Sequence, residues 1–182
     1  WLASFGGLLL LILKQPNLST AALVGLTLWM VALAAGLRWR SLLGTAFAGG
    51  ALGTASILIN EYQRLRVVSF LDPWNDPMGD GYQLVQSLLA IGSGGVMGQG
   101  YGLSTQKLQY LPIQSTDFIY AVFAEEFGFV GSLMLLLFLM LVAWVGLRVA
   151  LRCRSNQARL VAIGCCTILV GQSILNIAVA SG

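Results

Sequence analysis

The sequence contains no histidine, and charged residues make up only 9% of its 182 residues. The absence of histidine excludes Ser-His-Asp and Cys-His nucleophilic sites, histidine-ligated zinc and histidine general bases. Any acid–base chemistry must therefore use carboxylates, lysine or tyrosine. Soluble domains carry about 25% charged residues, so the low charge also argues against a soluble globular protein.

Cysteine is scarce as well, with three residues in the chain. Cys153, Cys165 and Cys166 form no CxxC pair and lie in or beside an apolar stretch. This placement predicts packing residues and no disulfide framework.

Apolar residues are abundant, at 57% of the chain with a mean hydropathy of +0.81. These values indicate an integral membrane protein, and we expect an all-α fold: a polytopic helical bundle in a single membrane domain. Gly49 and Gly53 have the small-xxx-small spacing that permits close helix packing in lipid, although ordinary membrane-helix glycines explain them equally well. Run lengths predict five hydrophobic segments, the first truncated, at about 1–13, 21–37, 41–59, 118–147 and 160–180.

Residues 61–117 differ in composition from these segments. They contain three of the four prolines and eight of the 22 glycines. A stretch of this length is usually a functional loop or disordered, and its many apolar side chains argue against disorder. The run YQLVQSLLAI, 82–91, predicts a short amphipathic helix at the membrane interface.

Charge distinguishes the two sides of the predicted bundle. Loops 38–40 and 148–159 contain six arginines and no acid, whereas 61–117 contains five acids and three basic residues. The positive-inside rule places the arginine loops in the cytoplasm and 61–117 on the extracytoplasmic side.

Three acids lie near the start of the fourth segment. Pro112 and cap-type residues precede Asp117, which we expect at the outer mouth of a membrane helix as an N-cap acid, a general base or both. Glu125 and Glu126 follow two turns later. Acids inside a membrane helix are costly and usually functional, although interfacial solvation or pairing with arginine is the alternative. Only Glu125 shares the broad face of Asp117.

The glycine-rich run IGSGGVMGQGYG, 91–102, matches neither G-x-G-x-x-G nor GxxxxGK[ST]. Its backbone is expected to pack closely against helices or to expose N–H groups toward an anionic ligand. Asp72, Asp76 and Asp80 recur every four residues with prolines between them. They are interpreted first as turn residues and second as weak divalent-cation ligands.

Basic residues are few in 61–117. Arg64 and Arg66 follow the third segment directly, and Lys107 precedes the Asp117 helix. Interfacial snorkelling is the simple interpretation of all three. The functional interpretation is that they bind a phosphate or diphosphate at the membrane surface.

Several motifs together resemble a known family. DPW, GYQxxQS, AIGSGG and TDFIxAxxAEExG resemble the SEDS family of polytopic glycosyltransferases, over about residue 14 to the C-terminus. Within that family the sequence is most similar to the FtsW branch of septal cell-wall synthesis. KQPNLSTAAL with YLPIQSTDFIY is similar to the cyanobacterial form.

The resemblance implies a multi-pass peptidoglycan polymerase of the bacterial inner membrane, acting at the division septum. Lipid II would be the donor, and a lipid-linked glycan or a second lipid II the acceptor. The family's essential aspartate corresponds to Asp117, which would act as general base. Arg64, Arg66, Lys107 and Glu125 are the candidate substrate-binding residues. No cofactor is certain, and a divalent cation (Mg²⁺ or Mn²⁺) is the candidate.

The resemblance also implies partners: a class B penicillin-binding protein with transpeptidase activity, other division proteins and the membrane, but no nucleic acid. Two departures accompany it. Asn17 and Ser19 stand where the family commonly has QPD-x-G-T, and upstream helices and a proline-rich C-terminal segment are missing. The chain is therefore expected to be an inactive fragment of a roughly ten-helix fold.

Three other functions remain open from the sequence: a RodA-like elongation polymerase, a flippase or transporter for lipid-linked precursors, and a non-catalytic division scaffold. A transporter requires polar residues near the midplane of several helices. Here the acids gather at one mouth, which favours chemistry at the membrane surface.

Overall fold

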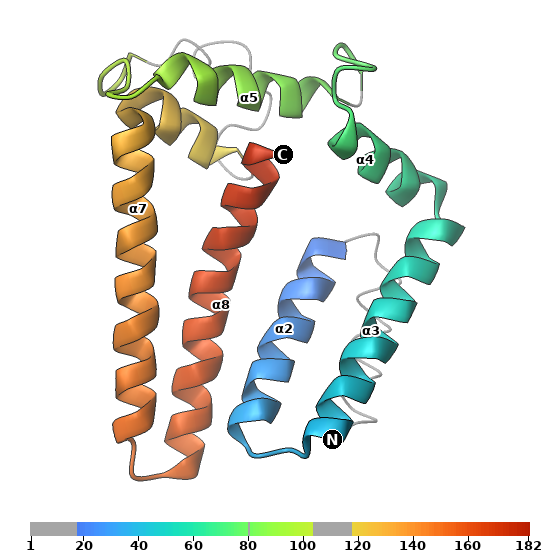
Figure 1. The fold of residues 1–182 in the computed structure, drawn as a ribbon, viewed down its shortest axis with the longest axis vertical. Coiled ribbons are helices and arrows are strands. Elements are labelled where there is room, and N and C mark those ends of the chain that lie inside the picture. The colour runs from blue at the N-terminus through green and yellow to red at the C-terminus, as the bar shows by residue number, and fades with distance from the viewer. Residues whose placement is uncertain (1–17, 80, 104–117) are drawn as a thin grey trace. The chain divides into compact units, whose positions relative to one another are not determined.

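The computed structural model describes residues 18–79, 81–103 and 118–182, which form helices and no strand. The all-α class predicted from the sequence is thereby confirmed, while the predicted segment 1–13 lies outside the described residues. In chain order the helices are α2 (Leu18–Ala34), α3 (Trp39–Ile59), α4 (Glu61–Leu71), α5 (Tyr82–Gly94), α7 (Ile119–Arg152) and α8 (Asn156–Ser181) (Figure 1).

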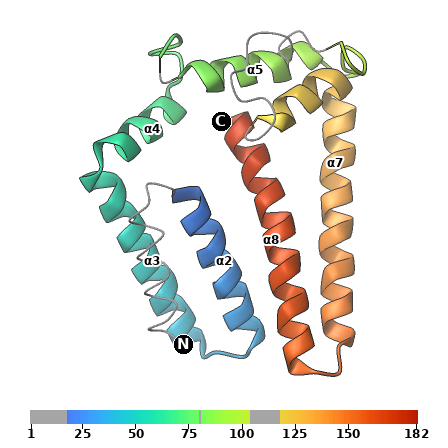
Figure 2. The same cartoon turned by 180° about the vertical axis from the view of Figure 1, so that it is seen from behind.

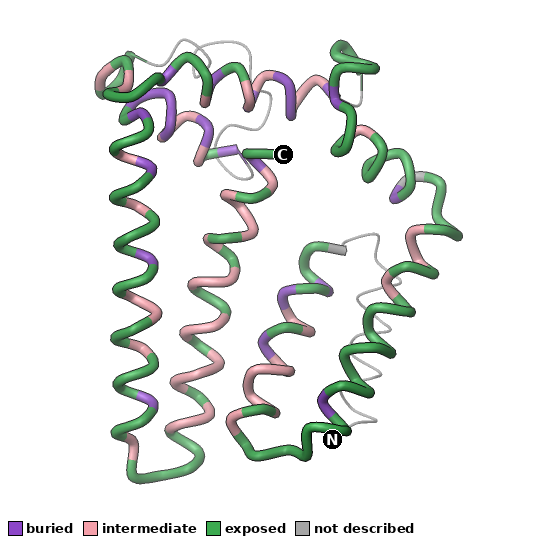
Figure 3. Tube along the Cα trace, viewed as in Figure 1, coloured by how far each residue is buried: buried purple, intermediate pink, exposed green. Residues whose placement is uncertain are grey.

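Three of these helices, α3, α7 and α8, are long and apolar enough to cross a membrane. The mean hydropathy of their most apolar windows is 1.7, 2.5 and 2.0. Exposed positions run along the length of α3 and α7, and many of them carry large hydrophobic side chains (Figure 3). Such surfaces are stable in lipid or against other apolar helices, so the chain is part of a multi-pass membrane protein.

The chain divides into two compact units. The first comprises Trp1–Gln63 and Leu141–Gln172, and the second Arg64–Met140 and Ser173–Gly182. α7 and α8 therefore each contribute one part to each unit.

In the first unit, small residues let helices approach closely. The indole N–H of Trp29 in α2 donates to the carbonyl of Leu42 in α3 at 3.1 Å. Gly146 of α7 faces the Sγ of Cys166 in α8, where an added Cβ would crowd the sulfur. All three cysteines are free; Cys153 and Cys166 are half-buried, whereas Cys165 is exposed and does not pack as predicted. Gly49 and Gly53 have no described atom near the position of a Cβ, so their spacing packs against no described part of the chain.

In the second unit, α5 and the first part of α7 lie side by side, as both views show (Figures 1 and 2). The predicted helix at 82–91 is confirmed by α5, which buries Leu84, Val85, Ser87, Ala90 and Gly94 along one face. α4 was not predicted, because its apolar and charged residues have no clear helical periodicity. The first half of its sequence nevertheless suits a helix, with an acid in the first turn followed by Gln, Arg and Leu.

Ser87 joins α5 to the end of α8. Its side chain is 0% exposed, and its Oγ donates to the carbonyl of Ala180 at 2.6 Å. Ser87→Ala is expected to destabilise the full-length protein by about 1–2 kcal/mol, because a buried carbonyl loses its donor. Thermal unfolding measures the effect.

Ser93→Ala is the matched control on the same helix. The Ser93 Oγ donates only to the carbonyl of Ala90 within α5, so its loss is expected to change the unfolding temperature little. Equal effects of the two substitutions would show that the bond between α5 and α8 contributes nothing specific.

Candidate functional site

α7 contains a break at Gly128, whose φ of 66° and ψ of −162° are not helical. An unbroken helix would bond the N–H of residues 129 and 130 to the carbonyls of residues 125 and 126. The structure instead pairs these four groups with a separate segment. Figure 1 shows the short first part of α7 turning away from the long part at this point.

The segment that replaces the helix bonds is 94–100, which we call the glycine clasp. The amides of Gln99 and Gly100 donate to the carbonyls of Glu125 and Glu126 at 3.0 and 3.1 Å. In return, the amides of Phe129 and Val130 donate to clasp carbonyls, those of Gly95 at 2.9 Å and Val96 at 3.2 Å. The two bonds lost at the break are thus replaced by four bonds to the clasp. Satisfied backbone groups are a requirement near lipid, where water cannot compensate for a lost bond.

Three glycines make this contact sterically possible. Gly98 has a φ of +79°, and a Cβ there would overlap the carbonyl oxygen of Glu126. A Cβ on Gly94 would overlap the carbonyl of Ala124, and one on Gly128 the amide nitrogen of Gly98. The predicted close packing of the glycine-rich run is therefore confirmed. Two of its N–H groups are used by protein carbonyls, which leaves them unavailable to an anionic ligand.

Glu125 and Glu126 lie just before the break, in the short first part of α7. Their side chains are 0% and 6% exposed. The predicted segment 118–147 corresponds to α7, but Gly128 interrupts the regular helix two residues after Glu126, so both acids lie in the part before the break. Two adjacent buried carboxyls are energetically costly and typical of functional sites.

An aromatic cluster adjoins the acids. The rings of Phe123 and Phe127 stack with centroids 4.7 Å apart, and Tyr101 approaches Phe127 at 6.3 Å. Tyr101 and the clasp residue Met97 are 85% and 79% exposed. This exposed apolar edge can contact a lipid chain.

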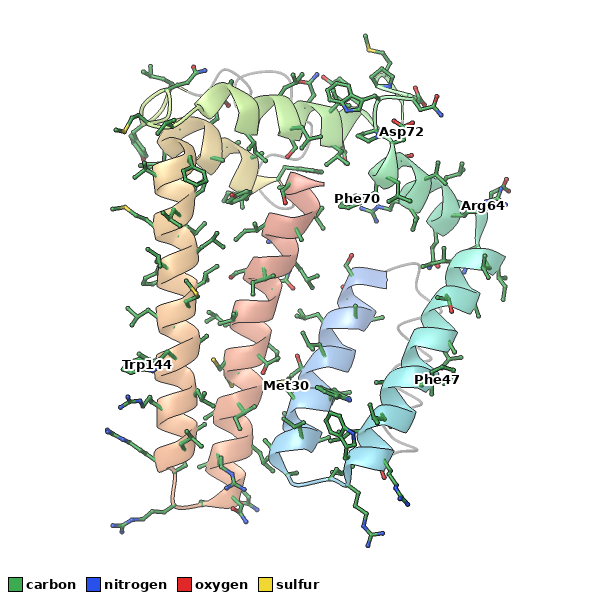
Figure 4. All side chains as sticks on the ribbon, in the orientation of Figure 1. Met30, Phe47, Arg64, Phe70, Asp72 and Trp144 are labelled. Carbon is green, nitrogen blue, oxygen red and sulfur yellow. The ribbon has the colours of Figure 1, made fainter. Side chains whose placement is uncertain are left out.

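The other predicted site residues are only partly described. Asp117 and Lys107 lie outside the described residues. Arg64 and Arg66 are exposed on α4 (Arg64 is labelled in Figure 4). The structure joins the backbone of Glu125 to the clasp.

The aspartates of the loop after α4 differ in what the structure describes of them. The Oδ1 of Asp76 accepts a bond from the amide of Gly79 at 3.0 Å, and its carbonyl accepts one from Gly81 at 3.1 Å. The turn interpretation is thus confirmed for Asp76, whereas Asp80 lies outside the described residues. In the described part of the chain, no three His, Cys, Asp or Glu residues gather where they could hold a metal ion.

The pairing of the clasp with α7 was not predicted from the sequence. A signal for it exists in the four-residue spacing of Gly94 and Gly98 together with the glycine that directly follows AEEF. These glycines indicate that the backbone approaches another segment closely, but they do not indicate which segment. Hydrogen bonds between distant segments leave no local periodicity in the sequence.

Comparison with known proteins gives one family match and several close relatives. A family model described as "Cell cycle protein", for FtsW, RodA and SpoVE, matches residues 1–182. A probable peptidoglycan glycosyltransferase FtsW from Synechocystis sp. is 61% identical over the whole chain, which covers 46% of that protein. A putative peptidoglycan glycosyltransferase FtsW from Cyanophora paradoxa is 50% identical, again over the whole chain and 46% of the relative.

A more distant relative is the stage V sporulation protein E of Bacillus subtilis, 37% identical over 95% of the chain and 47% of its own length. The chain thus spans less than half the length of the curated relatives it matches.

Proposed function

The chain belongs to the FtsW, RodA and SpoVE family of cell cycle proteins, and we propose that the complete protein is a peptidoglycan glycosyltransferase. In this proposal it polymerises lipid II into glycan strands during septal cell-wall synthesis. The observation that carries the proposal is the 61% identity, over every residue of the chain, to a protein named as a probable peptidoglycan glycosyltransferase FtsW. Two relatives that cover the whole chain at 61% and 50% identity are both named FtsW, which supports the septal role.

The proposed reaction needs one base and one counter-charge. The carboxylate of Asp117 accepts the proton of the acceptor sugar's 4-hydroxyl, and that oxygen forms a bond to the anomeric carbon of the donor. The bond from this carbon to the diphosphate oxygen breaks, so configuration inverts and polyprenyl diphosphate leaves. Negative charge develops on the diphosphate, and Arg64, Arg66 or Lys107 would stabilise it. A divalent cation, Mg²⁺ or Mn²⁺, would supply the same stabilisation.

The clasp has a defined part in this mechanism. Asp117 precedes α7 by two residues, so its position depends on the direction of the short first part of α7. The four backbone bonds between the clasp and residues 125–130 fix that direction. Glu125, buried in the same part, would bind the sugar or head group of the substrate. Positioning within about 1 Å is what such a reaction requires of its base.

The aromatic edge supports a lipid-linked substrate. Tyr101, Phe127 and Met97 offer an exposed apolar surface beside the buried acids, and a polyprenyl chain is the apolar part of lipid II. In this proposal the substrate lies at the extracytoplasmic boundary of the plasma membrane, at the septum. A class B penicillin-binding protein would cross-link the new strands, and other division proteins would recruit the complex.

Purified full-length protein incubated with lipid II, with and without its transpeptidase, tests the proposal. Formation of glycan polymer, seen as a ladder on a gel, is the expected result. Transfer of lipid II across a vesicle membrane with no polymer formed would contradict the polymerase and support the flippase. If the same amount of polymer forms when this protein is omitted from the mixture, the polymerase activity belongs to the transpeptidase.

A further inference from the structure

Six of the eight arginines of the chain belong to the first unit and lie in or beside its two short turns. Two flank Trp39 in the turn between α2 and α3, and four surround the turn between α7 and α8. They are Arg38, Arg40, Arg148, Arg152, Arg154 and Arg159.

Contacts between helices place both turns at one end of the first unit. Gly164 of α8 faces Val31 of α2, and Gly171 of α8 faces Leu23, so the two helices run antiparallel. The start of α8 at Asn156 therefore lies at the same end as the end of α2 at Ala34, about 6–8 Å beyond it along the helix axis. Both ribbon views show the two turns at the same end (Figures 1 and 2). At about 1.5 Å per residue, each arginine lies within roughly 6 Å of its turn along the helix axis.

The arginines have no acidic neighbour in sequence. Residues 35–41 and 148–159 contain no aspartate or glutamate. Five of the six arginines are exposed. The sixth, Arg159, is half-buried, and its Nε is buried with no hydrogen-bond acceptor in the part of the chain that the structure describes. The Nε–H of Arg159 is thus a buried donor without an acceptor among the described residues, and an anionic oxygen would supply the missing hydrogen bond.

One tryptophan contacts an arginine of this group, and another lies between two of them in sequence. The guanidinium carbon of Arg148 lies 4.3 Å from the ring centroid of Trp144, which is labelled in Figure 4. Trp39, between Arg38 and Arg40, is largely exposed. Exposed tryptophans are characteristic of the depth at which lipid head groups begin. This places the arginines where lipid phosphates lie.

We propose that these six arginines form one surface that binds the head groups of anionic phospholipids. Arginine suits this ligand, because its planar guanidinium donates two parallel bonds to a phosphate and is less hydrated than lysine. Neither of the chain's two lysines lies in either turn. This surface is positively charged, whereas 61–117 contains more acids than basic residues. None of its six arginines is a substrate-binding residue of the proposed reaction. Basic surfaces of this kind, between helices at the cytoplasmic boundary, bind acidic lipids.

The test is a titration of the full-length protein, in micelles of short-chain phosphatidylcholine, with phosphatidylglycerol, followed by thermal unfolding. Because a lipid that binds the folded state raises the unfolding temperature, the midpoint of the rise gives an apparent affinity. Arg38→Gln combined with Arg159→Gln removes one arginine from each turn. About fivefold weaker binding per arginine predicts a midpoint roughly 25-fold higher for the double variant. The four remaining arginines are expected to keep the orientation of the protein in the membrane unchanged.

Arg38→Lys with Arg159→Lys is the matched control: it keeps the charge but loses the two parallel bonds, so its midpoint is expected between those of the wild type and the glutamine variant. Inorganic phosphate is the second probe, and a rise in unfolding temperature with phosphate alone would overturn a lipid head group as the ligand. The proposal is also overturned if the wild-type protein shows no shift with phosphatidylglycerol, or if the glutamine variant titrates like the wild type. A glutamine variant that unfolds at the wild-type temperature in pure phosphatidylcholine establishes that lost binding is not lost folding.

Discussion

Replacing Gly98 with alanine is expected to destabilise the full-length protein by about 3–5 kcal/mol, an effect seen at few single positions in any protein. The new Cβ would overlap the carbonyl oxygen of Glu126, which is backbone and cannot rotate away. A φ of +79° adds roughly 1–2 kcal/mol of strain for a residue with a side chain. Moving the clasp to relieve the overlap would lengthen its bonds to residues 125–130, each of which contributes about 1 kcal/mol. The measurement is the unfolding temperature of the purified protein.

Three neighbouring glycines make the experiment specific. Gly92→Ala is the matched control, since a Cβ at that helical position meets no described atom and alanine favours a helix. Gly100→Ala is expected to cost about 1 kcal/mol, because its φ is positive but its contact is only the side chain of Leu103. Gly128→Ala is expected to behave like the Gly98 variant. A Gly98 variant as stable as the Gly92 variant would show that the clasp does not hold the break in α7.

The sequence predicted those parts of the fold that follow from local pattern. The apolar runs that became α3, α7 and α8 are visible as composition, and α5 is visible as apolar periodicity over 82–91. Hydrophobic segments and amphipathic faces are properties of neighbouring residues, and one sequence is sufficient to detect them.

The break in α7 could not be predicted in the same way. A glycine within an apolar run is compatible with a continuous membrane helix, and Gly146 of the same helix is one such case. What distinguishes Gly128 is a second segment, about 30 residues earlier, whose amides and carbonyls replace the helix bonds. Pairing at that separation is decided by tertiary packing. The burial of Glu125 depends on the same packing and was likewise beyond the sequence.

The sequence predicted which residues could act in the candidate site better than it predicted how they are arranged. Without histidine and with seven acids in the chain, few residues could act as a base, and the acids near the start of α7 were the evident group. Charge and position suggested Arg64 and Arg66 as phosphate ligands. The structure places them exposed on α4. Their role remains a prediction, as does that of Lys107.

Asp117→Asn is expected to reduce glycan polymerisation by a factor of about 10²–10⁴, the usual contribution of a general base. Asparagine has nearly the same shape but cannot accept the proton of the acceptor hydroxyl. Substrate binding should change little, because proton transfer belongs to the transition state. The reduction is therefore expected in kcat, with KM for lipid II almost unchanged. Asp117→Glu, which keeps a carboxylate on a longer side chain, is expected to retain part of the activity.

Asp76→Asn is the matched control within 61–117. The Oδ1 of Asp76 accepts a bond from the amide of Gly79, a role that an asparagine oxygen also fills. The Asp76 variant should therefore polymerise lipid II at nearly the wild-type rate.

The most direct test of the proposed mechanism is the rate of polymer formation from saturating lipid II by the folded, full-length Asp117→Asn protein with its transpeptidase present. The mechanism predicts a rate at least about a hundredfold below that of the wild type and of the Asp76→Asn control. A rate within a few-fold of the wild type would contradict Asp117 as the general base.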